Sequence, residues 1–267
     1  MKHNKNIIKV LIGSLLLVYT STILAQASTG PNKVYIEQVG STNTLTIQQV
    51  GGTNNVGGVT NTTPTTVDAS GITTLTPAAP SSTNYGLING SNNILSITQT
   101  GDDNSSQYSI RGSTNQYTST VTGDGNKTSL TIGDLVNNAN LRNVVTETIT
   151  GDNNTIIQQM VGNDITSTTT VTGDSNQITS YQLSSNGYKL NTVLGSNNVF
   201  NVEQSDSAGA NGHHLTMNTT GDFNSTTTQQ QGFNDTTVNI LTTGSHNTIT
   251  VRTSSTAIVN PGTAIAR

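Results

Sequence analysis

The sequence predicts an all-β protein, a two-sheeted parallel β-solenoid built from coils of about 22 residues. First, residues 32–51 alternate polar and apolar residues with a period of two, which is typical of strands with one buried face. Second, Gly40 and Gly51 close the two runs, and glycine suits the tight corner that must follow each strand. Third, this 11-residue unit recurs along the chain, so that two units make one strand-corner-strand-corner coil.

The repeat is marked by a glycine followed three residues later by an asparagine. Successive glycines at positions 90, 101, 112 and 123 are 11 residues apart, and so are those at 151, 162 and 173. A constant period in a chain of simple composition indicates a solenoid. The pairs are Gly40/Asn43, Gly90/Asn93, Gly101/Asn104, Gly112/Asn115, Gly123/Asn126, Gly151/Asn154, Gly173/Asn176, Gly195/Asn198, Gly221/Asn224 and Gly244/Asn247.

The N-terminal segment 1–27 has the pattern of a secretory signal peptide. Three lysines precede a mostly apolar run over residues 10–24, and Ala25-Gln26-Ala27 is a small-x-small cleavage site. No later apolar run is long enough to span a bilayer. We therefore expect an exported protein, extracellular or on the cell surface, without membrane insertion.

The remaining chain divides into four parts. Residues 28–51 form an opening coil, and 52–85 read as a flexible low-complexity insertion because Gly and Pro recur and the period is lost. The main array is expected over 86–253 and a tail or cap over 254–267. Longer steps between glycines predict extended corners at 133–140 and 205–210 and a β-bulge between Gly232 and Gly244.

The composition excludes several function classes. The 14 acidic residues outnumber the 10 basic ones, three of which lie in the leader, so nucleic acid is not an expected partner. There is no cysteine, hence no disulfide. Beyond the leader the histidines are His213, His214 and His246, which form no catalytic pattern, and we expect no enzyme. The isolated cations are expected on the solvated surface: Lys33, Arg111, Lys127, Arg142, Lys189 and Arg252.

The phase of the repeat places the asparagines in columns. One sheet should stack Asn104, Asn126, Asn154, Asn176, Asn198, Asn224 and Asn247. The other should stack Asn43, Asn93, Asn115 and Asn143, with Ile165 and His213 replacing Asn further on. Asparagine side chains one strand apart can hydrogen-bond to each other along the column, and this satisfies polar groups that burial would otherwise leave unpaired.

A second column follows the corner glycines of the same sheet. It contains Asp102, Asp124, Asp152, Asp174 and Asp222, with Ser196 and Ser245 in the gaps. Carboxylates about 4.8 Å apart would repel each other, and Ca²⁺ would relieve that repulsion through oxygen ligands. Alternatively, aspartate is present as a turn residue that hydrogen-bonds to backbone N–H groups, and no cofactor is required.

Threonine forms outward-facing rows on the predicted strands. The rows are Thr118 and Thr120, then Thr168, Thr170 and Thr172, then Thr226 and Thr228, and finally Thr248 and Thr250. Regular threonine arrays on a solenoid face resemble those with which some ice-binding proteins order water. The alternative is that threonine is present for its preference for exposed strands.

The motif Gln-x-Gly-x-x-Asn-x-apolar-x-apolar-x-Gln resembles the curlin repeat of curli fibre subunits. Gln38, Gly40, Asn43, Leu45, Ile47 and Gln49 match it position by position, whereas Ile110, Val121 and Met160 stand where Gln would be. The resemblance implies a secreted solenoid that stacks end to end into extracellular amyloid-type fibres for adhesion and biofilm. Its partners would be its own copies and curli-type secretion or nucleator proteins. The expected assembly core is Val34, Ile36, Gln38, Leu45, Ile47 and Gln49.

Two function classes remain open at this point. The first is a self-assembling fibre or matrix subunit, and the second is a monomeric solenoid that binds ice, glycan or a host surface. The opening coil can dock on the start of its own array or on the end of a neighbouring molecule. The absence of an obvious cap on this regular coil favours assembly.

Overall fold

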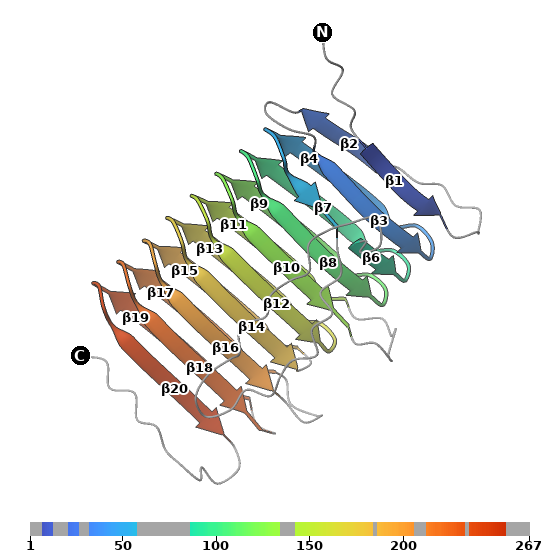
Figure 1. Ribbon diagram of the computed structural model, residues 1–267. Coiled ribbons are helices and arrows are strands. Elements are labelled where there is room, and N and C mark those ends of the chain that lie inside the picture. Colours follow the sequence, from blue (N-terminus) through green and yellow to red (C-terminus); the bar gives the residue numbers. More distant parts are fainter. Residues whose placement is uncertain are drawn as a thin grey trace.

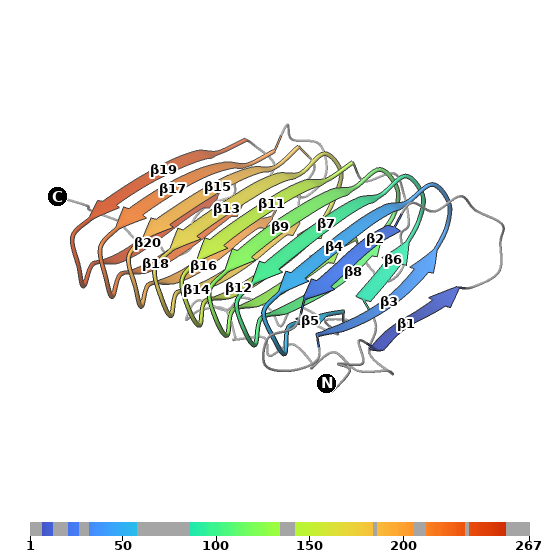
Figure 2. The same cartoon turned by 90° about the horizontal axis from the view of Figure 1, so that it is seen from above.

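The computed structural model describes residues 7–12, 21–26, 32–57, 86–133, 142–183, 186–205, 212–232 and 235–254, with backbone alone for the first two ranges. It is an all-β structure in which two parallel sheets form a solenoid of about 8 turns, with about 23 residues per coil. The strands run side by side along the whole solenoid (Figure 1), and the two sheets face each other (Figure 2). The predicted fold class is therefore confirmed.

Strands alternate between the two sheets along the chain. Sheet A contains β1 (Ile7–Ile12), β3 (Lys33–Val39), β5 (Asn55–Val56), β6 (Gly86–Asn89), β8 (Ser105–Arg111), β10 (Lys127–Ile132), β12 (Thr155–Val161), β14 (Gln177–Leu183), β16 (Val199–Ser205), β18 (Ser225–Gln231) and β20 (Thr248–Ser254). Sheet B contains β2 (Ser21–Gln26), β4 (Thr44–Val50), β7 (Ile94–Thr100), β9 (Gln116–Thr122), β11 (Val144–Thr150), β13 (Thr166–Thr172), β15 (Tyr188–Leu194), β17 (His214–Thr220) and β19 (Thr237–Thr243).

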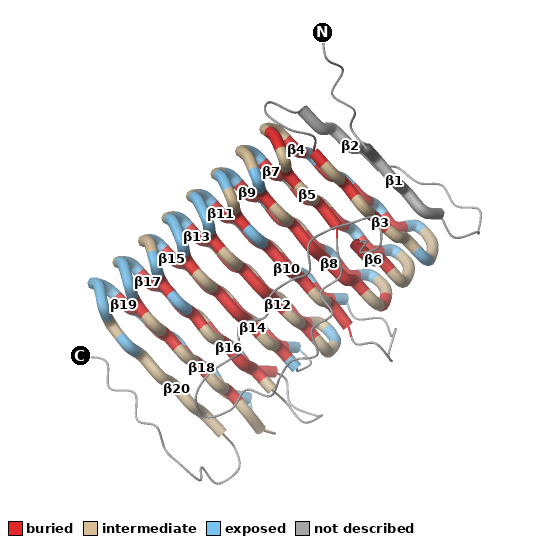
Figure 3. The backbone as a smooth tube through the Cα atoms, in the orientation of Figure 1, coloured by how far each residue is buried: buried red, intermediate tan, exposed pale blue. Residues whose placement is uncertain are grey.

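The alternation in sequence becomes alternation in burial. In β11, Val145, Glu147 and Ile149 point inward and are buried, while the residues between them are half-buried or exposed. Neighbouring strands pair in parallel with matching registers, so inward positions stack into continuous columns. Figure 3 shows the resulting band of buried positions along the solenoid. The core is thus a thin layer between the sheets.

The insertion interrupts a strand rather than separating two units. Strand β5 pairs with the first half of β3 and strand β6 pairs with its second half, so together they fill one strand position of sheet A. Residues 52–57 therefore belong to the solenoid, and the interruption starts after Gly57 instead of after Gly51. The sequence contains a sign of this continuation: Gly51 is followed three residues later by Asn54, which is one more copy of the corner motif.

The opening coil docks on its own array. Strand β4 pairs with β7 along its full length, from Thr44 opposite Ile94 to Val50 opposite Thr100. Of the two docking sites that the sequence left open, this structure shows the internal one. On the other side of the coil, the backbones of β1 and β2 pair with β3 and β4.

Each corner depends on the left-handed backbone region. Gly123 has a φ of 120°, and a Cβ at this position would lie 2.1 Å from the carbonyl oxygen of Gly151 in the next coil. The residue two positions after the corner glycine also has a positive φ; Asn153, which follows Gly151, has a φ of 57°. Glycine is therefore required where successive corners touch. The expected extended corners and the tail involve 134–141, 206–211 and 255–267, which lie outside the described residues. The expected β-bulge is absent from β19, since Thr237–Thr243 pairs residue by residue with β17.

Candidate assembly ladders and a buried polar cluster

The asparagines of sheet A form one continuous ladder. The backbone N–H and Nδ2 of Asn126 both donate to Oδ1 of Asn104, at 3.0 and 3.1 Å. Nδ2 of Asn126 also donates to the carbonyl oxygen of Gly151 at 2.7 Å. Its own Oδ1 accepts the same two bonds from Asn154. Every polar group of the side chain is thereby satisfied, although the residue is 1% exposed.

The same donor pattern continues through Asn176, Asn198 and Asn224 to Asn247. At the other end Asn104 donates to Asn54, whose backbone N–H donates to Asn32. The bonds between asparagines all point from each coil to the preceding one, whereas the Nδ2 bonds to the corner carbonyl oxygens point to the following coil. The Asn column that the sequence predicts is therefore present, and Asn32 and Asn54 extend it.

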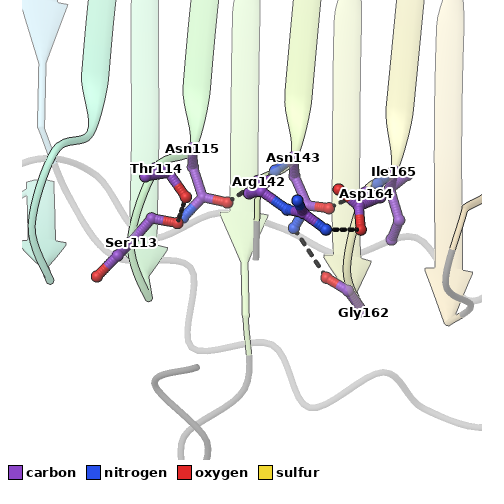
Figure 4. A network of polar contacts seen from close by, with 8 residues as sticks. All are labelled: Ser113, Thr114, Asn115, Arg142, Asn143, Gly162, Asp164 and Ile165. Carbon is purple, nitrogen blue, oxygen red and sulfur yellow. Dashed lines mark hydrogen bonds and ion pairs between the residues drawn. The ribbon is translucent and has the colours of Figure 1, made fainter. Parts of the chain in front are cut away.

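The ladder of sheet B is shorter. Asn93 donates to Asn43, and Asn115 donates to Asn93. Asn143 donates its backbone N–H to Asn115 at 3.1 Å, and its own Oδ1 accepts the N–H of Ile165 at 2.8 Å. Figure 4 shows this last stretch, in which Ile165 replaces asparagine and the side-chain ladder ends.

An ion pair spans the same two corners. Nη2 of Arg142 lies 2.6 Å from Oδ2 of Asp164 (Figure 4), and both residues adopt positive φ. Because the arginine side chain is 65% exposed, the pair contributes little stability.

Glutamines make additional ladders inside the core. Nε2 of Gln49 donates to Oε1 of Gln99 at 2.9 Å. At the other end of the solenoid, Gln182 donates to Gln204 and Gln204 to Gln230, at 2.8 and 3.0 Å. Between these ends the equivalent positions are apolar, as in Ile110, Val121 and Met160, and all three are buried.

The column of aspartates makes inter-coil hydrogen bonds. Oδ1 of Asp152 accepts the backbone N–H of Asp124 at 2.8 Å, and Oδ1 of Asp174 accepts that of Asp152 at 2.8 Å. The serines in the column play the same role, since Oγ of Ser196 accepts the N–H of Asp174. Asp102, Asp124 and Asp222 accept corresponding bonds. Within the described ranges no group of three or more His, Cys, Asp or Glu residues is placed to hold a metal ion.

The opening coil supplies its expected side chains to the core. Val34, Ile36, Leu45, Ile47 and Gln49 are at most 5% exposed. Gln38 is half-buried, and its register partner is Ile88. The four apolar residues among them pack in the same core cluster as Ile97, Tyr108 and other residues of the array. The coil is therefore an integral part of the solenoid.

A buried polar cluster in the middle of the core was not expected. It consists of Tyr117, Glu147, Gln158, Ser167 and Lys189, all at most 1% exposed. Glu147 accepts hydrogen bonds from the Tyr117 hydroxyl at 2.7 Å and from Nε2 of Gln158 at 2.6 Å. Oε1 of Gln158 accepts bonds from Nζ of Lys189 at 2.6 Å and from the Ser167 hydroxyl at 2.8 Å. Gln158, on sheet A, thus bridges an acid and a base on sheet B.

Burial shifts the ionisation of this cluster. It lowers the pKa of Lys189 to about 7, an effect that the charge of Glu147 opposes, and it raises the pKa of Glu147 above its ordinary value. The prediction that Lys189 lies on the solvated surface is wrong. The repeat could have indicated its burial, because Lys189 lies at one of the alternating positions of its strand that face the core. With all five groups buried, the cluster has no open position for a substrate.

The histidines also take structural positions. His213 is fully buried, with Nδ1 2.8 Å from the Thr236 hydroxyl and Nε2 3.0 Å from the Ser205 carbonyl oxygen. His214 is exposed on the outer face of sheet B, and His246 stacks on Phe223 with ring centroids 5.1 Å apart. The three rings therefore do not form one site.

Strand β20 is the last strand of sheet A among the described residues. The N–H of Ser225 in β18 donates to the carbonyl oxygen of Asn247, which precedes β20. Since alternate residues of a parallel strand bond to opposite sides, Thr248 and Thr250 direct their N–H and C=O groups away from β18. Among the residues that the structure describes, no strand pairs with that side of β20. Oδ1 of Asn247 likewise accepts no bond from a described residue.

The fold and the ladders define a parallel β-solenoid of stacked polar and apolar columns. Comparison with protein-family models, with curated proteins and with solved structures gave no match for this chain. The part of the chain that the structure describes has no helix long and apolar enough to cross a bilayer.

Proposed function

We propose that this chain is a secreted, curli-like structural protein that assembles end to end into extracellular amyloid-type fibres or matrix, without enzymatic activity. The observation that carries the proposal is the edge of β20, the last described strand of sheet A, which continues a sheet whose neighbouring strands stack in parallel with one register. An unpaired edge of this kind is a template for a further strand.

The opposite end offers a matching surface. Strand β3 carries Val34 and Ile36 inward, at the same positions as Ile249 and Val251 of β20 in the stacking pattern. In the full chain the backbones of β1 and β2 pair with β3 and β4. Removal of the predicted signal peptide would remove both strands and leave β3 and β4 as an edge. Export would thereby produce an end that can accept β20 of another copy.

Fibre growth by the mature chain, residues 28–267, tests the proposal. We expect electron microscopy of the incubated protein to show fibres whose strands run perpendicular to the fibre axis. Proline at Thr250 removes an N–H that points to the open edge and leaves the bonds of β20 to β18 in place. T250P should therefore remain folded and soluble and fail to elongate, while T250A should form fibres like the unmodified chain.

The two variants separate assembly from folding. Circular dichroism should give the same strand spectrum for T250P and T250A, because neither change touches the core. Fibre growth by folded T250P at the rate of T250A would overturn assembly through β20. A mature chain that stays monomeric after prolonged incubation would overturn the proposed function itself.

A further inference from the structure

The outer face of sheet B carries a regular array of threonines, which we call the threonine face. Its columns follow from the strand registers: Thr98 lies beside Thr120, Thr120 beside Thr148 and Thr148 beside Thr170. Two parallel columns flank this one. On β7, β9, β11 and β13 the array comprises Thr98, Thr100, Thr118, Thr120, Thr122, Thr146, Thr148, Thr150, Thr168, Thr170 and Thr172.

The array is periodic in two directions. Threonines of one column are about 4.8 Å apart, the distance between paired strands, and neighbouring columns are about 6.7 Å apart, the length of two residues along a strand. The β-branched side chain has few χ1 rotamers, so its methyl and hydroxyl groups hold a repeated orientation. The face therefore presents a lattice of alternating methyl and hydroxyl groups.

The hydroxyls of this lattice are available to water. None of the 11 threonines donates or accepts a side-chain hydrogen bond with another described residue, and all of them are half-buried or exposed. By contrast, Ile157 and Thr179, which occupy outward positions of sheet A, are 3% and 4% exposed. Outward positions of sheet A thus differ in exposure, since Lys127 and Val199 are exposed, whereas none of the 11 threonines of sheet B is buried. Thr226 and Thr228 of sheet A, which were expected in an outward row, point inward instead and are each 1% exposed.

The face is also free of ionic groups. At the outward positions of β4, β7, β9, β11, β13, β15, β17 and β19 there is no Asp, Glu, Lys or Arg. The outward positions of sheet A include Lys33, Glu37, Arg111, Lys127 and Glu203. An uncharged, repeating surface suits an uncharged, repeating ligand. A charged side chain would order water around itself, and that water would not match the lattice of the ligand.

We propose that the threonine face binds ice. Ice is a rigid lattice of uncharged hydrogen-bonding groups, and water held at the columns by threonine hydroxyls can merge with it while the methyl groups fill the spaces between. A crystalline polysaccharide would be expected to use stacked aromatic rings, and Tyr188 is the one aromatic residue besides His214 at the outward positions of these eight strands. Pairing of this face with a second copy is the alternative that sedimentation tests.

Ice binding does not depend on fibre formation, because the face lies on the flank of the solenoid and the proposed joint lies at its end. The test uses freshly purified monomeric protein of residues 28–267 and measures thermal hysteresis and ice recrystallisation. The double variant T120Y/T148Y places two bulky rings in the central column. Its matched control is T227Y, at an outward position of sheet A.

The unmodified chain and T227Y should shape ice crystals and show the same hysteresis, and T120Y/T148Y should lose it while keeping the same circular dichroism spectrum. No hysteresis in the unmodified chain, or equal hysteresis in all three folded proteins, would overturn the proposal. So would adsorption to cellulose or chitin in place of ice, or a dimer in sedimentation that T120Y/T148Y disrupts.

Discussion

Asn154 donates both its backbone N–H and its Nδ2 to Oδ1 of Asn126, which precedes it by 28 residues, at 2.9 and 3.1 Å. The corresponding bonds one coil further on join residues 22 positions apart, with distances of 3.0 Å. The ladder therefore keeps its geometry although the intervening corner differs in length. The asparagine column, rather than the length of the corners, holds the coils in register.

Replacement of Asn154 by alanine should strongly destabilise the fold. The change removes the acceptor for Asn176 and leaves the Gly173 carbonyl oxygen without its side-chain donor. With several buried groups unpaired, we expect a loss on the order of 3 kcal/mol in the free energy of unfolding, measured by urea denaturation. T150A, at an exposed position of β11, is the control and should change stability by less than about 0.5 kcal/mol. Equal stability of the two variants would contradict the ladder's role.

Two glycines of one corner should respond differently to substitution. G123A places a methyl group against the backbone of Gly151 and should cost more than about 2 kcal/mol. Gly125 has a φ of 67°, and its Cβ would approach only the side-chain oxygen of Asn153, which can move. Since asparagine occupies the equivalent place in the next coil, G125N should be tolerated. Thermal unfolding of both variants measures the two losses of stability. A larger loss in G125N than in G123A would contradict the prediction.

The buried lysine makes stability depend on pH. In the unfolded chain Lys189 keeps its proton up to its ordinary pKa of 10.5, whereas in the fold it releases the proton near 7. The unfolded state therefore binds more protons between these values, and stability should rise with pH across this window. Urea denaturation between pH about 7 and 9 should show the rise in the unmodified chain and its loss in K189M.

Glu147 has the opposite effect on the pH dependence of stability. Its pKa is raised in the fold, so its contribution is favourable at low pH and falls as the pH rises above 4.5. E147Q should accordingly reduce the pH dependence on the acidic side and leave the rise between pH 7 and 9 in place. A rise that survives in K189M would show that another group is responsible.

The aspartate column should be insensitive to calcium. D152N keeps the Oδ1 acceptor for the N–H of Asp124 and should be neutral, while D152A should lose about 1 kcal/mol. Because Oδ1 already binds this N–H, added Ca²⁺ should leave the melting temperature of all three proteins unchanged. A rise in melting temperature with Ca²⁺ that D152N abolishes would instead support the cation site.

The period of the sequence was sufficient to predict the two sheets, the coil length and the column containing Asn104 and Asn247. It was sufficient because side-chain direction in a strand alternates strictly and each coil pairs only with its neighbours. The same logic could have placed Lys189 inside the core, but the usual preference of lysine for solvent outweighed it. The continuation to Val56 was missed because the strand is completed by Gly86–Asn89, far away in the chain.

The contacts within the polar core cluster could not be predicted in the same way. Gln158 reaches Glu147 and Lys189 from the opposite sheet, and their pairing depends on how the two sheets are offset. The repeat specifies neighbours within a sheet and says nothing of this offset.

From Asn32 onward the first and the last described strands, β3 and β20, both belong to sheet A. If β20 of one copy pairs with β3 of the next, β19 and the following β4 are separated by one strand position in sheet B. Each joint of a fibre would then contain a slot one strand wide, bordered by two unpaired backbones. A strand from another segment or molecule could close it by β-strand addition. The places where such a fibre is joined would be both its weakest points and its most specific attachment sites.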